Sequence, residues 1–225
     1  AGRSMTAAGR SIDLREDPTA DLSEVVTHLR AGGVVAYPTE TVYGIGGACT
    51  PEGVAAVQSV KGRTADKPLL ALVPGAAAVP ELVWSDSARE FASIFWPGSV
   101  TLVLADPDAT FPTGVRDPRA GTVGVRVTPH PIAARLVAEL GAPLTSTSLN
   151  VPGEPPVTSG GEAREILERL GASDVWLLDA GTLPPSPPST VVDCTGDTPV
   201  VLRPGAVPID RLRCAIPETH ERRPD

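Results

Sequence analysis

Three segments of the chain place hydroxyl, amide or cationic side chains on one side of an expected strand and apolar side chains on the other. In the run 122–127, Thr122, Gly124 and Arg126 share one strand face and three valines occupy the opposite face. The run Ser146–Asn150 aligns its two serines with its asparagine, and Arg203 stands where a strand meets a proline turn. Hydroxyls and amides suit ribose and amino-acid groups, and arginines suit carboxylate or phosphate. One such segment fits a strand with a solvated face, but three together favour a polar cleft.

A cationic loop lies between an expected helix and a buried strand. It runs from Lys61 to Pro68 and contains Arg63 and Lys67 as well. In an acidic protein, cations placed directly before a core strand favour a clamp for an anionic ligand such as a polyphosphate. The alternative is a solvated surface turn.

Residues 37–46 form an expected strand that runs into a polar, glycine-rich turn at 44–47. Taken alone, these glycines permit close backbone approach without specifying a ligand. The sequence has no P-loop, no Rossmann glycine fingerprint and no nucleophile elbow. His28, His130 and His220 are scattered, so we expect neither a metal site nor a histidine-based catalytic triad.

The elements that must position these residues alternate between helix and strand along the chain. Continuous Val/Leu runs are typical of sheets covered on both faces. We therefore expect a single-domain α/β fold with a mixed, twisted sheet and flanking helices. The periodicity predicts helices over 19–30, 51–60, 87–95, 131–140 and 161–170, and strands over 34–37, 69–73, 100–105, 122–127, 144–148, 175–179, 190–194 and 200–203.

Composition limits the class of protein. The 225 residues carry a net charge of −8, whereas a general nucleic-acid binder usually has a basic field. No apolar run is long enough for a membrane span, and the N-terminus lacks a secretory signal. The three cysteines are widely spaced, as in reduced cytosolic proteins. We expect a cytoplasmic protein with an expression scar at 1–4 and a disordered tail at 217–225.

Seven motifs follow one another along the chain: YPTETVYGIG at 37–46, KGRTADKPL at 61–69, FWPGSVTLV at 95–103, TVGVRV at 122–127, STSLN at 146–150, STVVD at 189–193 and LRPG at 202–205. In this order they resemble the YrdC/Sua5 family of L-threonylcarbamoyladenylate synthases, which implies a YrdC-like sheet with a large concave cleft. The resemblance covers residues 12–207, the expected catalytic domain, and the chain looks like the short form that lacks an additional C-terminal domain.

The resemblance implies both the YrdC-like fold and a reaction. L-threonine, bicarbonate and ATP, accompanied by Mg²⁺, would give threonylcarbamoyl-AMP and pyrophosphate. The product would pass to a tRNA threonylcarbamoyl transferase complex that makes N6-threonylcarbamoyladenosine (t6A) at tRNA position 37. A weak contact with tRNA is a further expectation.

The same resemblance implies roles for individual residues. Lys61 and Arg63 are the expected catalytic cations. The positions that match the L-threonine site are Thr39, Arg126, Ser146 and Ser189. The positions that match the ATP site are Lys61, Arg63, Lys67, Thr122, Ser148, Asn150, Arg203 and the backbone near Pro156.

Two positions leave questions for the structure. Leu72 stands near the place where some relatives have a histidine that helps to hold threonine, so how the threonine carboxylate is held here is an open question. Arg126 can supply a bidentate contact by itself. Glu40 is the nearest carboxylate to the first motif, and both a role as general base and a structural role in the turn are open. We expect Thr39 to contact the hydroxyl that distinguishes threonine from valine.

Three rival interpretations stay open at this point. The first is a module of the same fold that binds double-stranded RNA or tRNA without catalysis. The second is a relative of the carbamoyl-adenylate domain of hydrogenase maturation proteins, and the third is a paralogue that binds ATP with weak or lost synthase activity. The acidic charge argues against the first, and the intact lysine loop argues against the third.

Overall fold

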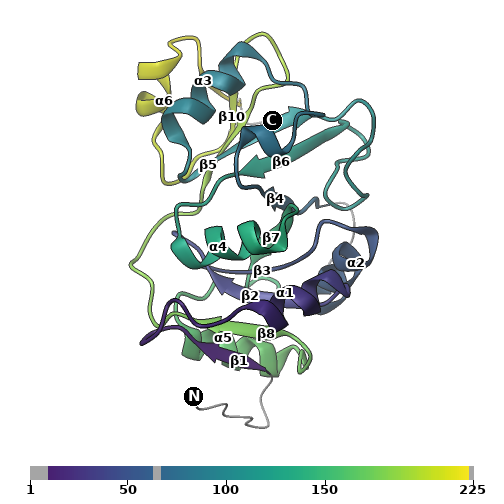
Figure 1. Ribbon diagram of the computed structural model, residues 1–225. Coiled ribbons are helices and arrows are strands. Elements are labelled where there is room, and N and C mark those ends of the chain that lie inside the picture. The colour runs from purple at the N-terminus through teal and green to yellow at the C-terminus, as the bar shows by residue number, and fades with distance from the viewer. Residues whose placement is uncertain (1–9, 63–66, 223–225) are drawn as a thin grey trace.

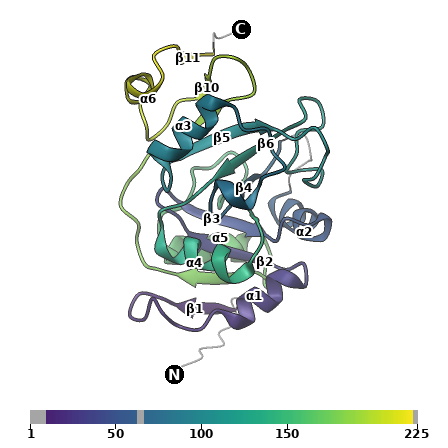
Figure 2. The ribbon, with the colours of Figure 1, turned by 45° about the horizontal axis from the view of Figure 1, so that its top comes forward.

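A single mixed sheet of eleven strands organises the computed structural model, which describes residues 10–62 and 67–222. The strand order is β1-β8-β2-β3-β7-β4-β6-β5-β9-β10-β11, and it runs from the N-terminal end of the molecule to the C-terminal end (Figures 1 and 2). The strands are β1 (Ser11–Asp13), β2 (Val34–Pro38), β3 (Tyr43–Gly47), β4 (Leu70–Leu72), β5 (Val100–Ala105), β6 (Thr122–Arg126), β7 (Leu144–Ser148), β8 (Trp176–Asp179), β9 (Thr190–Asp193), β10 (Val200–Arg203) and β11 (His220–Glu221).

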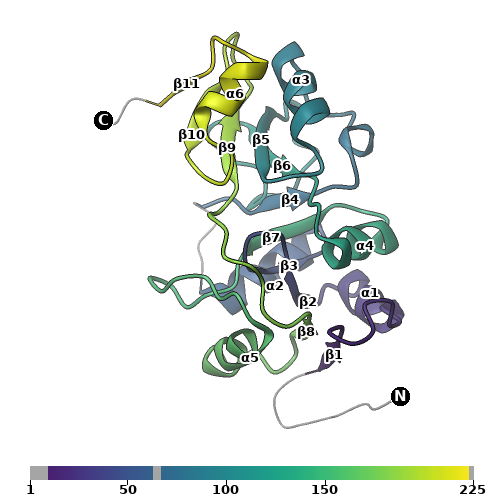
Figure 3. The ribbon, with the colours of Figure 1, turned by 90° about the vertical axis from the view of Figure 1, so that its left-hand side faces the viewer.

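Helices cover the sheet from both sides, as the continuous apolar strands predicted. The helices are α1 (Ser23–Arg30), α2 (Pro51–Lys61), α3 (Asp86–Phe95), α4 (Pro131–Leu140), α5 (Gly160–Arg169) and α6 (Ile209–Ala215), with a 3₁₀ turn at Ala76–Ala78. Figure 3 shows α1 and α4 on one side of the sheet and α5 on the other. The expected α/β class and mixed sheet are confirmed.

Two apolar cores result from this arrangement. The larger one joins α2, α3, α5 and α6 to one sheet face through residues such as Val57, Phe91, Ile166 and Leu212. The smaller one lies between α1, α4 and the opposite face, where Leu136 of α4 is fully buried. The smaller core covers β2 and β8 and reaches as far as Leu72 and Leu144, so the rest of that face is left to other side chains.

Local signals explain where several helices begin and end. Thr50 caps α2 by accepting from Gly53 N, and Pro51 follows at its first turn. Ser159 forms a capping box with Glu162 at the start of α5. Gly141 ends α4 in the left-handed conformation, with φ of 70°. Of these, Gly141 lies just past the helix end that the sequence predicted, whereas the two N-terminal caps are seen only in the structure.

The glycine-rich segment 44–47 is a strand, not the turn that the sequence predicted. It forms β3, which pairs antiparallel with β2 and β7. A Cβ on Gly46 would lie 1.7 Å from Thr145 O, and one on Gly47 would lie 2.9 Å from Gly53 O. Glycine is needed here because the neighbouring backbones approach too closely for a side chain.

The C-terminal segment also differs from the prediction of a disordered tail at 217–225. His220 and Glu221 form β11, which pairs parallel with Val200 and Val201 of β10. Thr219 is buried, and its carbonyl accepts from Arg213 Nε at 3.0 Å. These bonds hold the segment against α6 through residue 222. Among the described residues, no helix is long and apolar enough to cross a membrane.

Candidate active site

One stretch of the sheet carries most of the polar residues that the sequence singled out. It is the face of β7, β4, β6, β5, β9 and β10 that continues from the α1/α4 core, and we call it the polar stretch. Adjacent strands align its members: Leu70 pairs with Ser146, Val103 with Gly124 and Val191 with Arg203. Gly124, Val103 and Val191 are half-buried, whereas the opposite face of the same strands is buried. Strand order thus brings together residues that are distant in the chain, such as Leu70 and Ser146, which are 76 positions apart.

Arg126 is the most enclosed cation of the polar stretch. Its side chain is 4% exposed, and its Nη1 lies 3.1 Å from Oε1 of Glu40. Glu40 belongs to the turn 39–42 between β2 and β3, and its Oε2 accepts from the Thr128 hydroxyl at 2.7 Å. Among the described residues, the buried Nε of Arg126 has no hydrogen-bond partner. A buried donor without a partner costs about 1–3 kcal/mol, so this edge of the guanidinium is suited to an incoming acceptor.

Ser189 links the arginine of β10 to the central strands. Its hydroxyl lies 3.0 Å from Thr101 Oγ1, and Arg203 Nη2 donates to its carbonyl at 2.8 Å and to its hydroxyl at 3.2 Å. Burial, followed by the positive charge of Arg126, lowers the pKa of Arg203. Two guanidinium groups that repel one another across the same polar stretch are best relieved by an anion placed between them.

The turn 39–42 holds Thr39 below the surface. Its Oγ1 donates to Val42 O at 2.7 Å and accepts from the backbone N–H groups of Thr41 and Val42, both at 3.2 Å. The hydroxyl therefore already closes the turn. A contact between Thr39 and the hydroxyl of a ligand, which the family resemblance implies, would have to replace one of these bonds.

Ser146 lies beside Tyr37, which is fully buried. Burial raises the pKa of Tyr37, and the neighbouring Ser146 hydroxyl and Arg126 partly oppose this rise. The Tyr37 hydroxyl donates to Thr145 O at 3.2 Å. A Cβ on Gly44 would lie 3.4 Å from both Ser146 Oγ and the Tyr37 ring, so any side chain there would pack directly against the serine hydroxyl, which is itself buried.

Lys61 is the last residue of α2 rather than part of a loop, and it is buried. Its Nζ donates to Ser148 O at 2.9 Å, Asn150 O at 2.6 Å and Asn150 Oδ1 at 2.7 Å. Ser148 Oγ donates to the same amide oxygen at 3.0 Å. The ammonium group thus fixes the end of β7, and it brings three of the predicted ATP-binding residues into direct contact.

Four predicted ATP-binding positions remain. Arg63 falls outside the described residues, and Lys67 is exposed just beyond that gap. Thr122 is half-buried at the start of β6 and pairs with Ala105. Pro156 is exposed in the connection between β7 and α5.

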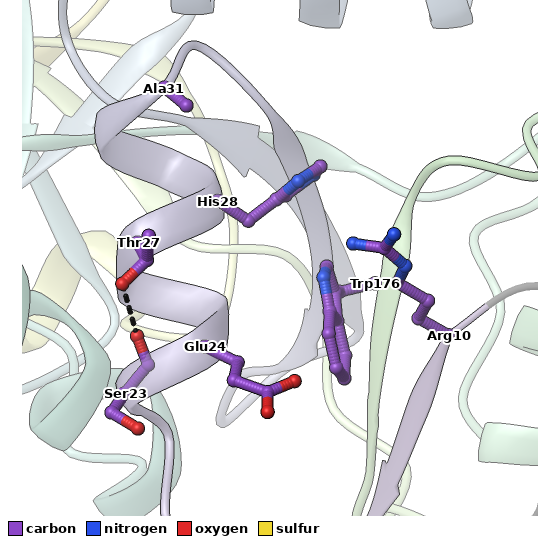
Figure 4. A pocket seen from close by; sticks show the side chains of 7 residues that line it. All are labelled: Arg10, Ser23, Glu24, Thr27, His28, Ala31 and Trp176. Atoms are coloured by element: carbon purple, nitrogen blue, oxygen red, sulfur yellow. Dashed lines mark hydrogen bonds between the residues drawn. The ribbon is translucent and has the colours of Figure 1, made fainter.

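A hollow of about 330 Å³ lies elsewhere, beside α1 at the β1–β8 end of the sheet. Figure 4 shows its Trp176 ring between the side chains of α1 and Arg10, whose guanidinium carbon lies 5.8 Å from the ring centroid. None of the residues predicted to bind threonine or ATP lines this hollow, so it is separate from the polar stretch. It is lined by Arg10, Ser23, Glu24, Thr27, His28, Ala31 and Trp176.

Comparison with known proteins identifies the family. The model of the Sua5_yciO_yrdC family, described as "Telomere recombination", matches residues 27–205. A putative threonylcarbamoyl-AMP synthase of Mycobacterium tuberculosis (strain H37Rv) is 39% identical over 201 residues, which make up 88% of this chain and 89% of the relative. The chain belongs to the Sua5/YciO/YrdC family.

Solved structures of the family agree with the fold. Sua5 of Pyrococcus abyssi, complexed with L-threonine, aligns with a TM-score of 0.83 and 30% identity over 95% of this chain. The chain spans 62% of that protein. E. coli YciO aligns with a TM-score of 0.74 and 27% identity over 92% of this chain and 100% of its own. The predicted family, its fold and its enzyme class, threonylcarbamoyl-AMP synthase, are confirmed.

Leu72 takes no polar part in this member of the Sua5/YciO/YrdC family. It is fully buried, pairs with Arg126 and Leu144, and joins the α1/α4 core. A leucine therefore closes the apolar core next to the polar stretch. The residue that pairs with Leu72 on β6 is Arg126, whose side chain makes an ion pair with Glu40.

Sequence reasoning missed Thr101 and Thr128, and it left the role of Glu40 open. Thr101 was the one polar residue in the apolar run 100–105, which is a usable signal. Thr128 continues the alternation of Thr122, Gly124 and Arg126 by one more step. The Glu40–Arg126 pair joins positions 86 residues apart, and no local pattern indicates it.

Proposed function

We propose that this chain forms threonylcarbamoyl-AMP from L-threonine, bicarbonate and ATP, with release of pyrophosphate. One observation supports this above the others. Arg126, Ser146, Ser189 and Arg203 come from four separate segments and lie on one polar stretch of the sheet. Two guanidiniums and two hydroxyls in such a place suit a carboxylate and a phosphate bound side by side.

The proposed chemistry needs positioned cations more than a covalent nucleophile. The threonine amine adds to bicarbonate with loss of water, and an oxygen of the resulting N-carboxylate attacks the α-phosphorus of ATP. The bond from that phosphorus to the β-phosphate bridging oxygen breaks, and pyrophosphate leaves with its electron pair. Arg126 would bind the threonine carboxylate, and Arg203, with Lys61, Arg63 and Lys67, would stabilise the charge that develops on the phosphates.

The contacts of Ser189 and Lys61 support a division of the predicted residues into a threonine site and an ATP site. Ser189 hydrogen-bonds Arg203 directly and faces Thr101, so threonine bound at Ser189 and a phosphate bound at Arg203 would be neighbours. Lys61 holds Ser148 and Asn150 in place, and these two would contact the adenylate. We propose that Ser146, Ser189 and Thr39 complete the threonine site and that Thr122 and the backbone near Pro156 complete the ATP site.

Mg²⁺ would enter with ATP. Within residues 10–62 and 67–222, no group of three or more His, Cys, Asp or Glu residues is arranged to hold a metal ion. The ion would then be held mainly by the phosphate oxygens and water, as is common for Mg²⁺. No step above depends on a protein-bound metal.

The product would be handed to a tRNA threonylcarbamoyl transferase complex for t6A synthesis. A mixed anhydride of a carbamate and a phosphate hydrolyses readily, which favours prompt transfer to a partner. Cytoplasm, where ATP and tRNA are both present, is the proposed place of work. Any contact with tRNA would be weak, because the net charge of −8 opposes the RNA backbone.

The test of this function is the substrate dependence of pyrophosphate release. We expect release only when ATP, L-threonine and bicarbonate are present together, and we expect mass spectrometry to detect threonylcarbamoyl-AMP. Release that ignores L-threonine would contradict the proposal. Release driven by carbamoyl phosphate without threonine would instead support a carbamoyl-adenylate-forming relative.

A further inference from the structure

The turn between β2 and β3 brings a carboxylate against the most enclosed cation of the polar stretch. Glu40 Oε1 lies 3.1 Å from Arg126 Nη1 and 3.4 Å from Ser99 Oγ. Its Oε2 accepts the 2.7 Å bond from Thr128, whose own oxygen accepts from His130 N at 3.2 Å. Three side chains from two segments of the chain, Ser99 on one and Arg126 and Thr128 on the other, therefore converge on this one carboxylate.

This arrangement gives one side of the Arg126 guanidinium a partner, Glu40 at Nη1, and leaves the buried Nε on the other side without one among the described residues. A carboxylate binds an arginine bidentately when a fixed edge of the planar fork faces it. Because the guanidinium is planar and rigid, the ion pair between Glu40 and Nη1 also fixes the direction in which the Nε side of Arg126 faces.

Both oxygens of Glu40 already accept hydrogen bonds or ion-pair contacts. A general base must be within hydrogen-bond reach of the proton that it removes, and the hydrogen bonds and ion pair of Glu40 among the described residues are with side chains that it holds in place. Glu40 has instead the contacts of a group that fixes its neighbour. Arg126 would otherwise be an uncompensated buried charge in the unliganded protein, which proteins avoid.

We infer that Glu40 is a positioning residue for substrate binding: it holds Arg126 by Nη1 so that the opposite edge of the guanidinium receives the carboxylate of L-threonine. This inference rests on the proposed function. It adds to that function the residue that determines how the threonine site is oriented, and it assigns Glu40 no proton transfer.

The experiment compares Glu40→Ala and Glu40→Gln with the wild type in steady-state pyrophosphate release, with L-threonine and ATP varied separately. In Glu40→Ala the guanidinium loses its anchor, so we expect the KM for L-threonine to rise at least about 10-fold and the KM for ATP to stay within about 2-fold. Glu40→Gln keeps an oxygen for Nη1 but not a basic carboxylate. We expect its KM for L-threonine to rise less than about 3-fold, with kcat retained.

Addition of acetate to Glu40→Ala gives a second measurement. A small carboxylate can occupy the space of the missing side chain, so we expect it to lower the KM for L-threonine towards the wild-type value. A purely structural loss would not respond to acetate. If Glu40→Ala does not fold, Thr128→Val replaces it: removing the bond to Oε2 should raise the KM for L-threonine about 2- to 3-fold and leave the KM for ATP unchanged.

The matched control is Glu139→Gln on α4. Glu139 makes an ion pair with Arg135 at the same distance, 3.1 Å, but at a more exposed position. This variant should leave both KM values unchanged, because exposed ion pairs contribute little.

Two results would overturn the inference. If Glu40→Gln and Glu40→Ala lose kcat equally and by orders of magnitude, Glu40 acts as a general base. If Glu40→Ala changes both KM values alike, or if Thr128→Val standing in for it leaves the threonine KM unchanged, Glu40 does not orient the threonine site. A wild-type protein that releases no threonine-dependent pyrophosphate would contradict the proposed function instead, which keeps the two failures distinct.

Discussion

Two stretches of the same sheet face have opposite fates. Over β8 and β2, the side chains of Trp176, Val35 and Tyr37 are covered by α1 and α4 and belong to an apolar core. Over β6, which is the fifth strand beyond β8 in the sheet, the same face carries Thr122, Gly124 and Arg126. We call the first the covered stretch, and the second is part of the polar stretch.

On this face of the sheet, the apolar layer ends where α1 and α4 no longer cover the strands. Leu72 and Leu144 are the last members of the covered stretch, and Arg126 and Ser146 follow them on the neighbouring strand positions. Stability should therefore depend chiefly on one stretch and ligand binding on the other. Substitutions in each stretch can test this separation.

The largest expected effect on stability is at Leu136, which lies on α4 and packs over the covered stretch. The side chain is fully buried between α4 and the sheet. Leu136→Ala should lower the free energy of unfolding by about 2–5 kcal/mol, because it removes apolar contacts and leaves a cavity. Urea denaturation followed by circular dichroism measures this loss.

The same variant should keep its substrate affinities. Assayed well below its melting temperature, Leu136→Ala should show KM values for L-threonine and ATP within about 2-fold of the wild type, because its site residues are untouched. A large, selective change in either KM would show that the covered stretch takes part in binding.

A substitution at Gly124 in the polar stretch should affect activity rather than stability. Expressed as a free energy, this effect is smaller than the loss of stability expected for Leu136→Ala. A Cβ there would lie 3.5 Å from Thr101 Cγ2 and 3.8 Å from Leu70 Cβ, which are ordinary contacts. Gly124→Val therefore fits the strand, and it places two methyl groups between the predicted ligand contacts at positions 122 and 126. We expect turnover at fixed substrate to fall at least about 10-fold, while the unfolding free energy stays within about 0.5 kcal/mol or rises.

Gly46→Ala is the matched control for this substitution. Its Cβ would lie 1.7 Å from Thr145 O, so the backbone of β3 must shift. That variant should lose stability by about 1–3 kcal/mol, as overpacked sites do. If Gly124→Val is destabilised as much as Gly46→Ala, the polar stretch is a packed surface rather than an open one.

The sequence was informative where the signal is local. Alternation placed Thr122 and Arg126 on one face, and helical periodicity located α4 at 131–140, where the structure has it. It was not informative where a contact depends on chain segments meeting. The glycines of β3 resemble a turn until Thr145 is placed beside Gly46, because the close approach is a property of the neighbouring strand.

The site shows the same limit. The family motifs named Arg126, Ser189 and Arg203, but the bonds among them required strand order to be known. Glu40 lies in a turn 86 residues before its partner, so its role could not be read from either segment alone. Thr39 lies in the same turn, and only the structure shows that its hydroxyl is already bonded within it.

The smallest expected effect is on the pH dependence of the free energy of unfolding, and it arises at His28 on α1. His28 lies on α1 beside the hollow of Figure 4, and its Nε2 accepts from Val34 N at 3.1 Å. Burial lowers the pKa of His28 below its ordinary value of 6.5, although the Val34 carbonyl oxygen, 3.2 Å from the same nitrogen, partly opposes this. Above that value the side chain is neutral in both the folded and unfolded chains and contributes no pH dependence. As the pH falls below about 6.5, the unfolded chain takes up the proton first, so the free energy of unfolding decreases.

Replacing His28 by Gln should remove part of this decrease. The amide oxygen of glutamine can accept from Val34 N as the ring nitrogen does, but it does not titrate. We expect the loss of unfolding free energy between pH 7 and pH 5 to be smaller in His28→Gln than in the wild type, as measured by urea denaturation at a series of pH values. His220→Gln, at an exposed position on β11, is the control and should keep the wild-type slope. An unchanged slope in His28→Gln would mean that the acid sensitivity comes from elsewhere, with buried His130 next to Glu40 as the first alternative.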